Sequence, residues 1–295
     1  MIPAQFDYVK AGSVDEAVSA LGQHGDDAKV LAGGQSLVPL LSMRLAAPSM
    51  LIDINGIAEL DRLDVDSAGV RFGANVRHAR LLADAEVARV QPLLAKALGY
   101  VAHPTIRNRG TTLGSIVHAD ASAEMPVVLA LLDGTVTVAS ASGKRMIAAQ
   151  DLFVGPLETS LKPGEIATDA HVPALAANTG VGFTEIARRH GDYALCGVAA
   201  LVSTDDDGAI TAVRAGYLSV CDTPTVVDVS EVFMEGRLTD RAVDDAAELA
   251  LASLEPETDI HATADYRRQL ARVLTARAVR EAHDDSAVRR SGVNL

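Results

Sequence analysis

Residues 31–37 read Leu31-Ala32-Gly33-Gly34-Gln35-Ser36-Leu37, and they decide how the N-terminal part of the chain is interpreted. The run at 29–32 is short and apolar, as expected for a strand that ends at the two glycines. Because glycine has no Cβ, a turn there lets backbone N–H groups approach a phosphate, and the glutamine and serine add hydrogen-bonding side chains. A Gly-Gly turn after a strand is more commonly only a turn, so this segment alone leaves both interpretations open.

A second segment of similar chemistry reads Ile106-Arg107-Asn108-Arg109-Gly110-Thr111-Thr112-Leu113-Gly114-Ser115-Ile116-Val117-His118-Ala119-Asp120. Pro104 precedes it and favours an extended approach. Two such loops in one domain are suited to gripping the two phosphates of a dinucleotide. Neither segment is a Rossmann Gly-x-Gly-x-x-Gly fingerprint, and the chain has no Gly-x-x-x-x-Gly-Lys-Ser/Thr loop. The pyrophosphate must therefore be held differently from that in NAD-binding Rossmann domains and P-loop nucleotidases.

The N-terminal half mixes helix and strand patterns. Ser13-Val14-Asp15-Glu16 has the spacing of a capping box, and apolar side chains follow on one helix face until Gly22. Apolar runs at 50–54, 70–72 and 135–138 predict strands, and residues 92–100 are predicted to be helical.

The composition changes at residues 173–180, which are rich in small and turn-forming residues and mark the predicted domain boundary. Strand patterns follow at 182–187, 197–203 and 209–220. The last two are separated by the turn signal Asp205-Asp206-Asp207-Gly208, so we expect an antiparallel meander. Helical patterns at 240–254 and 264–282 are expected to pack on it.

The composition excludes several classes of protein. A formal net charge of −13 argues against nucleic-acid or lipid-headgroup binding. No apolar run approaches the ~18 to 20 residues that span a bilayer, and the first residues show no signal sequence, so we expect a cytoplasmic protein. Cys196 and Cys221 are too few for a zinc or iron–sulfur site within this chain, and both are expected to be small buried apolar residues.

Other active sites are poorly supported. Gly34-Gln35-Ser36-Leu37-Val38 lacks the closing glycine of a hydrolase nucleophile elbow. The eight histidines do not show the spacing that places two metal ligands on one helix face. Asp53, Asp61, Asp64 and Asp66 lack an EF-hand pattern and are expected to form a solvated turn. His118 either serves a cofactor pocket or has a structural role.

Three blocks of the sequence resemble a known family. They are residues 32–41, residues 106–111 and the run Arg188-Arg189-His190-Gly191-Asp192-Tyr193-Ala194. Their order and spacing are similar to those of the medium, FAD-binding subunit of carbon monoxide dehydrogenase and related molybdenum hydroxylases. The flavin domain of xanthine dehydrogenase and the nicotine-degrading dehydrogenases are also similar. The resemblance implies an α+β protein in which a two-lobed, vanillyl-alcohol-oxidase-like FAD-binding domain precedes a smaller α+β domain of antiparallel sheet and helices. It implies a first domain at 1–175, with lobes at about 1–55 and 56–175, a second at 180–285, and a tail at 286–295.

The resemblance also implies which residues hold FAD. The pyrophosphate would be bound by Ala32, Gly33, Gly34, Gln35, Ser36, Thr111, Gly114 and Ser115, and Leu37 is also expected to bind the cofactor. Leu113 stands where the family has the first glycine of the second block, so its side chain is expected to crowd the phosphate. Asp120 and Glu124 would contact the sugar-like chain of the flavin, and Tyr193 would lie near the isoalloxazine. A tyrosine packed in the core is the alternative for Tyr193.

As a member of this family, the chain would be an oxidoreductase subunit with no catalytic acid, base or metal ligand of its own. Electrons would reach its FAD from a small 2Fe-2S subunit, after a large molybdopterin subunit oxidises the substrate, and would leave to an external acceptor. The alternatives are a scaffold that has lost FAD or binds it only structurally, and a stand-alone flavin enzyme. Resemblance to the nicotine-degrading enzymes favours an N-heterocyclic or aromatic substrate over carbon monoxide.

Overall fold

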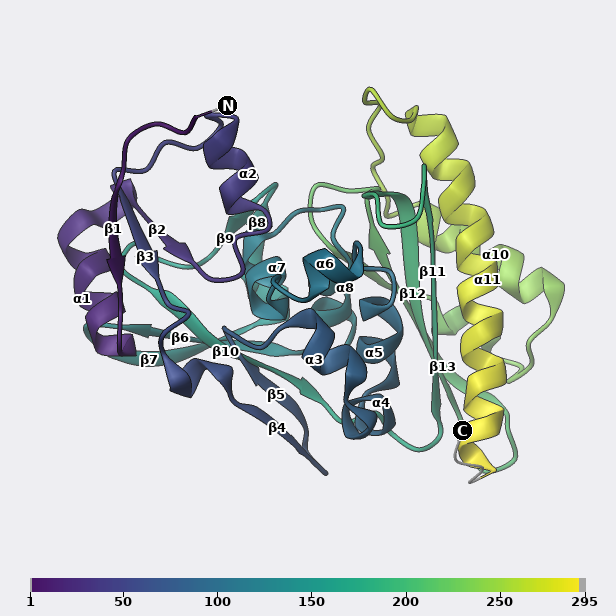
Figure 1. The fold of residues 1–295 in the computed structure, drawn as a ribbon. Helices are drawn as coiled ribbons and strands as arrows, with labels where there is room; N and C mark the ends of the chain where they lie inside the picture. Colours follow the sequence, from purple (N-terminus) through teal and green to yellow (C-terminus); the bar gives the residue numbers. More distant parts are fainter. Residues whose placement is uncertain (1, 292–295) are drawn as a thin grey trace.

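A computed structural model describes residues 2–291, and three sheets form its framework (Figure 1). The first sheet is parallel, with strand order β1-β3-β2: β1 spans Asp7–Lys10, β2 Ala28–Leu31 and β3 Met50–Asp53. Helix α1, Val14–His24, joins β1 to β2 and buries one apolar face. Its N-terminus is capped as predicted, because the Ser13 side chain accepts a hydrogen bond from the Glu16 N–H at 3.1 Å. The helix continues past Gly22, where the sequence pattern predicts its end.

The second sheet is antiparallel, with order β4-β5-β10-β6-β7. Its strands are β4 Leu63–Asp66, β5 Gly69–Gly73, β6 Thr135–Ser140, β7 Gly143–Ala148 and β10 Ile166–Pro173. Between β5 and β6 run the helices α3 His78–Ala83, α4 Ala85–Val90, α5 Pro92–Leu98, α6 Pro104–Arg107, α7 Thr112–His118 and α8 Glu124–Leu131. The smaller elements are α2 Leu37–Ser42, α9 Ala149–Leu152, the β8 Phe153–Gly155 and β9 Glu158–Thr159 pair, and 3-10 turns at Gly25–Asp27, Ala58–Asp61 and Ser230–Phe233. In Figure 1 the helices α3–α8 lie in the middle of the molecule, between the N-terminal sheets and the C-terminal sheet.

The C-terminal part contains the predicted meander. Its strands are β11 Thr179–Ala187, β12 Ala194–Thr204, β13 Ile210–Leu218 and β14 Thr225–Asp228, paired antiparallel in that order. Helices α10, Asp240–Leu251, and α11, Ala264–Arg290, follow it. In Figure 1 they cover the side of this sheet that faces away from α5 and α8. A Cβ at Gly182 would lie 2.1 Å from the carbonyl oxygen of Ala278, so glycine in β11 allows α11 to pack directly on the strand backbone.

Several local predictions differ from the structure. Most of the segment at 106–120 is helical, in α6 and α7, where the sequence predicts a loop. Asp64 and Asp66 lie on strand β4 instead of in a turn. Helix α11 continues to Arg290 and so includes residues assigned to the tail. Cys196 is buried, but Cys221 is only half-buried.

Candidate functional site

The two glycine-bearing segments are in direct contact. A Cβ at Gly33 would lie 2.5 Å from the carbonyl oxygen of Arg109 and 2.9 Å from the backbone nitrogen of Thr111. Real side chains do not approach backbone so closely, so only glycine fits at this position. Gly34 has a φ of +72°, the left-handed region that glycine adopts without strain. The chain therefore places residues 33–34 against residues 109–111, although they are far apart in sequence.

Backbone donors in the first segment are open to a ligand. Within residues 2–291, the N–H groups of Gly33, Gly34, Gln35 and Ser36 make no hydrogen bond to another protein group. Their residues are half-buried, and the Gln35 side chain donates to the Gly33 carbonyl at 3.1 Å. Four successive donors beside a second loop can bind an anion that bears several oxygens.

Thr111 is the N-cap of helix α7 and lies within the second segment. Its hydroxyl accepts a hydrogen bond from the Gly114 N–H at 3.2 Å, as an N-cap side chain does. A Cβ at Gly114 would lie 2.5 Å from that hydroxyl, so a larger residue there would displace the hydroxyl from its present position. Ser115 is half-buried in the first turn of the same helix.

The structure corrects the expectation for Leu113. Its side chain is 1% exposed and belongs to the hydrophobic core of the N-terminal domain. It therefore points away from the surface on which a phosphate would rest, and the predicted crowding is wrong.

His78 is buried and forms hydrogen bonds with the second segment. The sequence did not indicate this role. Its ring is 3% exposed, its Nδ1 lies 2.9 Å from the Thr112 hydroxyl, and its backbone N–H donates to the Gly110 carbonyl at 3.1 Å. Burial, followed by the positive charge of Arg107, lowers the pKa of His78 to about 4, so the ring is neutral at pH 7. Neither its position in helix α3 nor its spacing from other motifs in the sequence indicates this role.

Asn55 and Arg77 were also missed, and they link the two segments by hydrogen bonds. Asn55 donates from its side-chain amide to the carbonyl of Ala32 at 2.9 Å. Arg77 donates to the carbonyl of Arg109 at 2.7 Å and to the side-chain oxygen of Asn55. Arg77 and Arg109 thus place positive charge beside the glycine-bearing segments, which is favourable next to a diphosphate, whereas the Arg107 guanidinium donates to the carbonyls of Val101 and Ala102.

A hydrogen-bonded seam joins the segment after α7 to the C-terminal sheet. The Ser219 N–H donates to the Ala121 carbonyl at 2.8 Å, and the Ser219 hydroxyl lies 2.6 Å from that of Ser122. The same Ser219 hydroxyl donates to the carbonyl of Ala194, the residue after Tyr193. These contacts bring residues 120–124 close to the start of β12.

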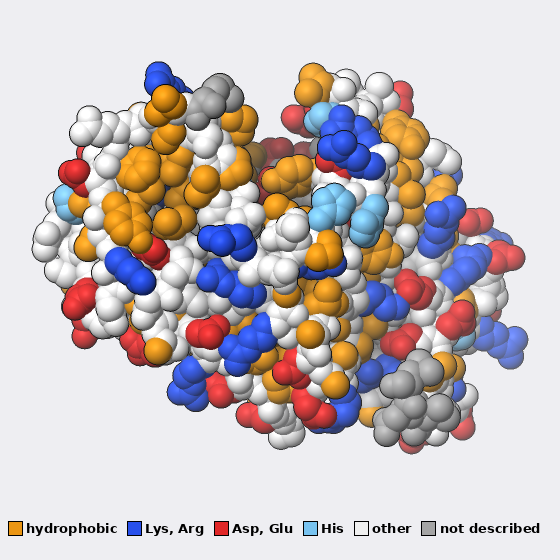
Figure 2. All heavy atoms as spheres, in the orientation of Figure 1, with side chains coloured by type: hydrophobic (Ala, Val, Ile, Leu, Met, Phe, Trp, Pro, Cys, Tyr) orange, Lys and Arg blue, Asp and Glu red, His pale blue; other side chains and the backbone are white. Residues whose placement is uncertain are grey.

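Asp120, Glu124 and Tyr193 gather at this seam. Tyr193 is 62% exposed, so the alternative that it fills the core is wrong. Partial burial and then the charges of Asp120 and Glu124 raise its pKa. Glu124 is 8% exposed, and burial raises its pKa to about 7, with a further contribution from Asp120. Burial, followed by the charge of Glu124, raises the pKa of Glu185 to about 8. Figure 2 shows this face hollowed between the N-terminal lobe and the C-terminal domain, with acidic side chains deep in the hollow.

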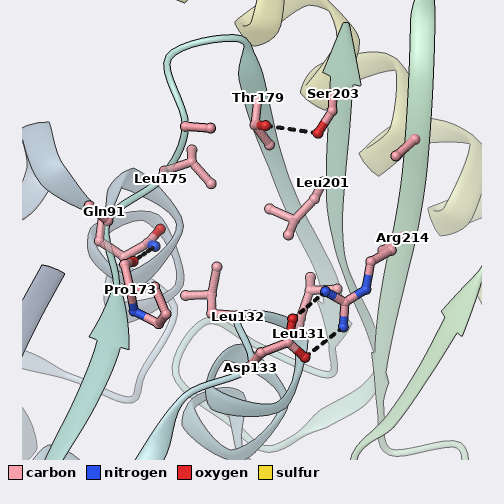
Figure 3. Close-up of a pocket in the computed structure, with 13 residues that line it drawn as sticks. Gln91, Leu131, Leu132, Asp133, Pro173, Leu175, Thr179, Leu201, Ser203 and Arg214 are labelled. Carbon is pink, nitrogen blue, oxygen red and sulfur yellow. Dashed lines mark hydrogen bonds and ion pairs between the residues drawn. The ribbon is translucent and has the colours of Figure 1, made fainter. Parts of the chain in front are cut away.

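A cavity of about 190 Å3 lies elsewhere between the domains, and its lining residues differ from those of the seam at Ser219. Gln91, Leu175, Leu201 and the ion pair of Asp133 with Arg214 surround it (Figure 3). None of the predicted FAD-binding residues lines this cavity. It is therefore separate from the glycine-bearing segments.

Comparisons with known proteins match both halves of the chain. The family described as the FAD binding domain in molybdopterin dehydrogenase matches residues 4–175. The family described as the CO dehydrogenase flavoprotein C-terminal domain matches residues 182–282. The chain belongs to the FAD-binding medium subunits of the molybdenum hydroxylases. The predicted family, α+β fold, FAD cofactor and oxidoreductase class are thereby confirmed.

Full-length relatives of this medium subunit come from several enzyme complexes. It is 40% identical over 283 residues to the alpha subunit of the 6-hydroxypseudooxynicotine dehydrogenase complex of Paenarthrobacter nicotinovorans, covering 96% of each chain. It is 35% identical over 283 residues to the carbon monoxide dehydrogenase medium chain of Hydrogenophaga pseudoflava, covering 96% of this chain and 98% of that one. Its structure matches a chain of quinoline 2-oxidoreductase from Pseudomonas putida 86 with a TM-score of 0.91 and 38% identity, covering 97% and 99% of the two chains.

Two further findings concern residues 2–291 only. No helix in this range combines the length and apolar character that crossing a membrane requires. No group of three or more His, Cys, Asp or Glu side chains in it is arranged to hold a metal ion.

Proposed function

We propose that this medium subunit relays electrons through its FAD, receiving them from iron–sulfur clusters of a partner subunit and passing them to an external acceptor. Bound FAD supplies the redox chemistry, because its ring system accepts one or two electrons. The chain itself binds and orients the cofactor. No acid or base from the chain is required for electron transfer, and none is assigned.

The FAD pyrophosphate would lie between the two glycine-bearing segments. It would contact Ala32, Gly33, Gly34, Gln35, Ser36, Thr111, Gly114 and Ser115, and Leu37 would lie next to them in the cofactor site. The other end of the cofactor would reach the seam, where Asp120 and Glu124 would meet the flavin side chain and Tyr193 its ring. The observation that carries this proposal is the packing of Gly33 on the backbone of residues 109–111, which places the free backbone donors of residues 33–36 beside the second segment.

Flavin content tests the cofactor site. We expect the purified chain to be yellow, or to become so with added FAD, and to bind it with one-to-one stoichiometry. A colourless chain that takes up no FAD would instead support the scaffold alternative. That alternative rests on Leu113, and the buried position of the leucine side chain removes its support.

The relatives are named as subunits or chains of larger enzymes, which supports a multi-subunit complex for this protein. We propose a heterotrimer with a large molybdopterin subunit and a small 2Fe-2S subunit. Copurification from the native cell with one larger and one smaller chain is the expected result. Purification of the chain by itself, with full oxidase activity, would favour a stand-alone flavin enzyme. A cytoplasmic location stays a prediction of the sequence.

We propose an N-heterocyclic or aromatic substrate for the complex. Relatives named for pseudooxynicotine, nicotine and caffeine support this class, as does the quinoline enzyme. Relatives named for carbon monoxide and glyceraldehyde show that the medium subunit alone does not define the substrate. Reduction of the bound flavin by the purified complex, with N-heterocycles compared against carbon monoxide, tests the choice.

A further inference from the structure

The glycine-bearing segments are held together by side chains outside both of them. Asn55 follows strand β3, and its amide donates to the Ala32 carbonyl at 2.9 Å and to the Asp53 carboxylate at 2.7 Å. The backbone N–H of Asn55 donates to the same carboxylate at 2.8 Å. Asp53 in turn accepts a hydrogen bond from the Tyr8 hydroxyl, so Asn55 is fixed against the parallel sheet.

Arg77 links Asn55 to the second glycine-bearing segment. It immediately precedes helix α3, and its guanidinium donates to the Arg109 carbonyl at 2.7 Å and to the Asn55 side-chain oxygen. Arg77 also pairs with Thr111 in an isolated β-bridge, so its backbone is fixed beside the second segment. A continuous chain of hydrogen bonds therefore runs from the Ala32 carbonyl through Asn55 and Arg77 to the Arg109 carbonyl.

We propose that Asn55 and Arg77 are positioning residues that hold the two segments at the spacing required for the FAD diphosphate. This inference rests on the proposed location of FAD. Both side chains act on carbonyl groups of the segments, which leaves backbone N–H groups such as those of residues 33–36 free to face the ligand. A site whose donors are fixed before the ligand arrives loses less entropy on binding, so breaking this link should weaken binding.

The planar fork of arginine allows Arg77 to bind both segments. Two N–H groups of one guanidinium reach two acceptors on different segments, and a lysine ammonium on a flexible stem does not reproduce this geometry. Arg80, one turn further along α3, provides a matched control. It is exposed and donates to the backbone and carboxylate of Asp61, away from both segments.

The test is FAD titration of the apo-forms of the full chain, followed by quenching of flavin fluorescence. We expect Asn55→Ala and Arg77→Met each to raise the Kd for FAD about tenfold or more, as loss of a charge-assisted hydrogen bond predicts. Arg77→Lys should keep only part of the wild-type affinity, and the control Arg80→Met should cause no loss. Because both residues act through one connection, Asn55→Ala combined with Arg77→Met should weaken binding little more than either change alone.

A second readout separates positioning from general destabilisation. ADP contains the diphosphate and riboflavin does not, so the variants should lose ADP affinity and keep riboflavin affinity, with a Tm of the apo-chain close to that of Arg80→Met. Equal FAD affinity in the wild type and both variants would overturn the inference, as would a loss that is the same for ADP and riboflavin. Failure of the wild-type chain to bind FAD would instead overturn the proposed function.

Discussion

At the scale of single residues, the site depends on a glycine that allows two backbones to touch. Gly33 packs against the Arg109 carbonyl, and its would-be Cβ contacts are all backbone atoms, which cannot rotate away. The same residue type elsewhere has no such role: a Cβ at Gly22, in α1, meets nothing within 4 Å. The function of a glycine is therefore decided by what lies opposite its missing side chain.

We predict that Gly33→Ala separates the two segments. Overpacking against fixed atoms costs about 1–3 kcal/mol, so the free energy of unfolding should fall by that amount and FAD content should drop sharply. Urea denaturation and the ratio of flavin to protein absorbance measure the two effects. Gly22→Ala is the control and should stabilise the chain by about 0.5–1 kcal/mol with full FAD content, because the position is helical and open. Full FAD content in Gly33→Ala would contradict the proposed site.

At the scale of elements, the start of helix α7 contributes both to the stability of the fold and to the proposed FAD site. The Thr111 hydroxyl caps the helix, while the side chain of Leu113 anchors it in the core. Helix α11 begins with an equivalent cap, in which the Thr263 hydroxyl accepts from the Tyr266 N–H at 3.2 Å, but it lies far from the glycine-bearing segments in Figure 1. Removing each cap in turn therefore distinguishes an effect on stability from an effect on FAD binding.

Thr111→Ala and Thr263→Ala should each lower the free energy of unfolding by about 1 kcal/mol, as loss of an N-cap does. Only Thr111→Ala should also weaken FAD binding, because it alters the geometry of the second segment. Thr111→Ser keeps the hydroxyl and should restore both properties. The measurements are thermal unfolding of the apo-chain and FAD titration. Equal FAD affinity in the two alanine variants would show that the cap has no part in the site.

At the scale of the whole molecule, the seam between the domains contains two acids without a counter-charge. No ion pair within the described part of the chain includes Glu124 or Glu185, and one Glu185 carboxylate oxygen is buried without a hydrogen-bond partner. Burial raises the pKa of Glu124 to about 7 and that of Glu185 to about 8. The titratable groups that interact with them are Asp120 and Tyr193 near Glu124, and Tyr100 near Glu185.

Because the pKa values of Glu124 and Glu185 are raised in the folded chain, we predict that the free energy of unfolding falls as the pH rises. Between pH ~4.5 and ~8 the folded chain binds more protons than the unfolded chain, so the contribution of the pair is complete below the unfolded pKa and is lost as the pH passes through 7 and 8. Relative to wild type, Glu185→Gln should gain roughly 1–3 kcal/mol in unfolding free energy between pH 6 and pH 8.5. Urea midpoints at both pH values measure this change. Glu86→Gln, an exposed control that removes an acid paired with Arg89, should show no such gain.

Much of the architecture could be predicted because it is encoded locally. The cap at Ser13, the turn at Asp205–Gly208 and the strand patterns of the C-terminal meander each depend on neighbouring residues. Residues 112–118 were predicted as a loop but are helical. Threonine, glycine and serine have weak helix propensity, and the packing of Leu113 in the core stabilises the helix. The role of Asn55 and Arg77 could not be predicted at all, since both act through backbone carbonyls that are remote in sequence.

The sequence by itself located the two glycine-bearing segments, because glycines and hydrogen-bonding side chains are visible without coordinates. Its resemblance to the medium subunits indicated the family and the FAD cofactor. The tertiary structure alone decided that the segments touch, that the Leu113 side chain faces the core and that two acids share the seam between the domains. The physical reason is that backbone contact, side-chain direction and desolvation depend on what lies across a gap in space.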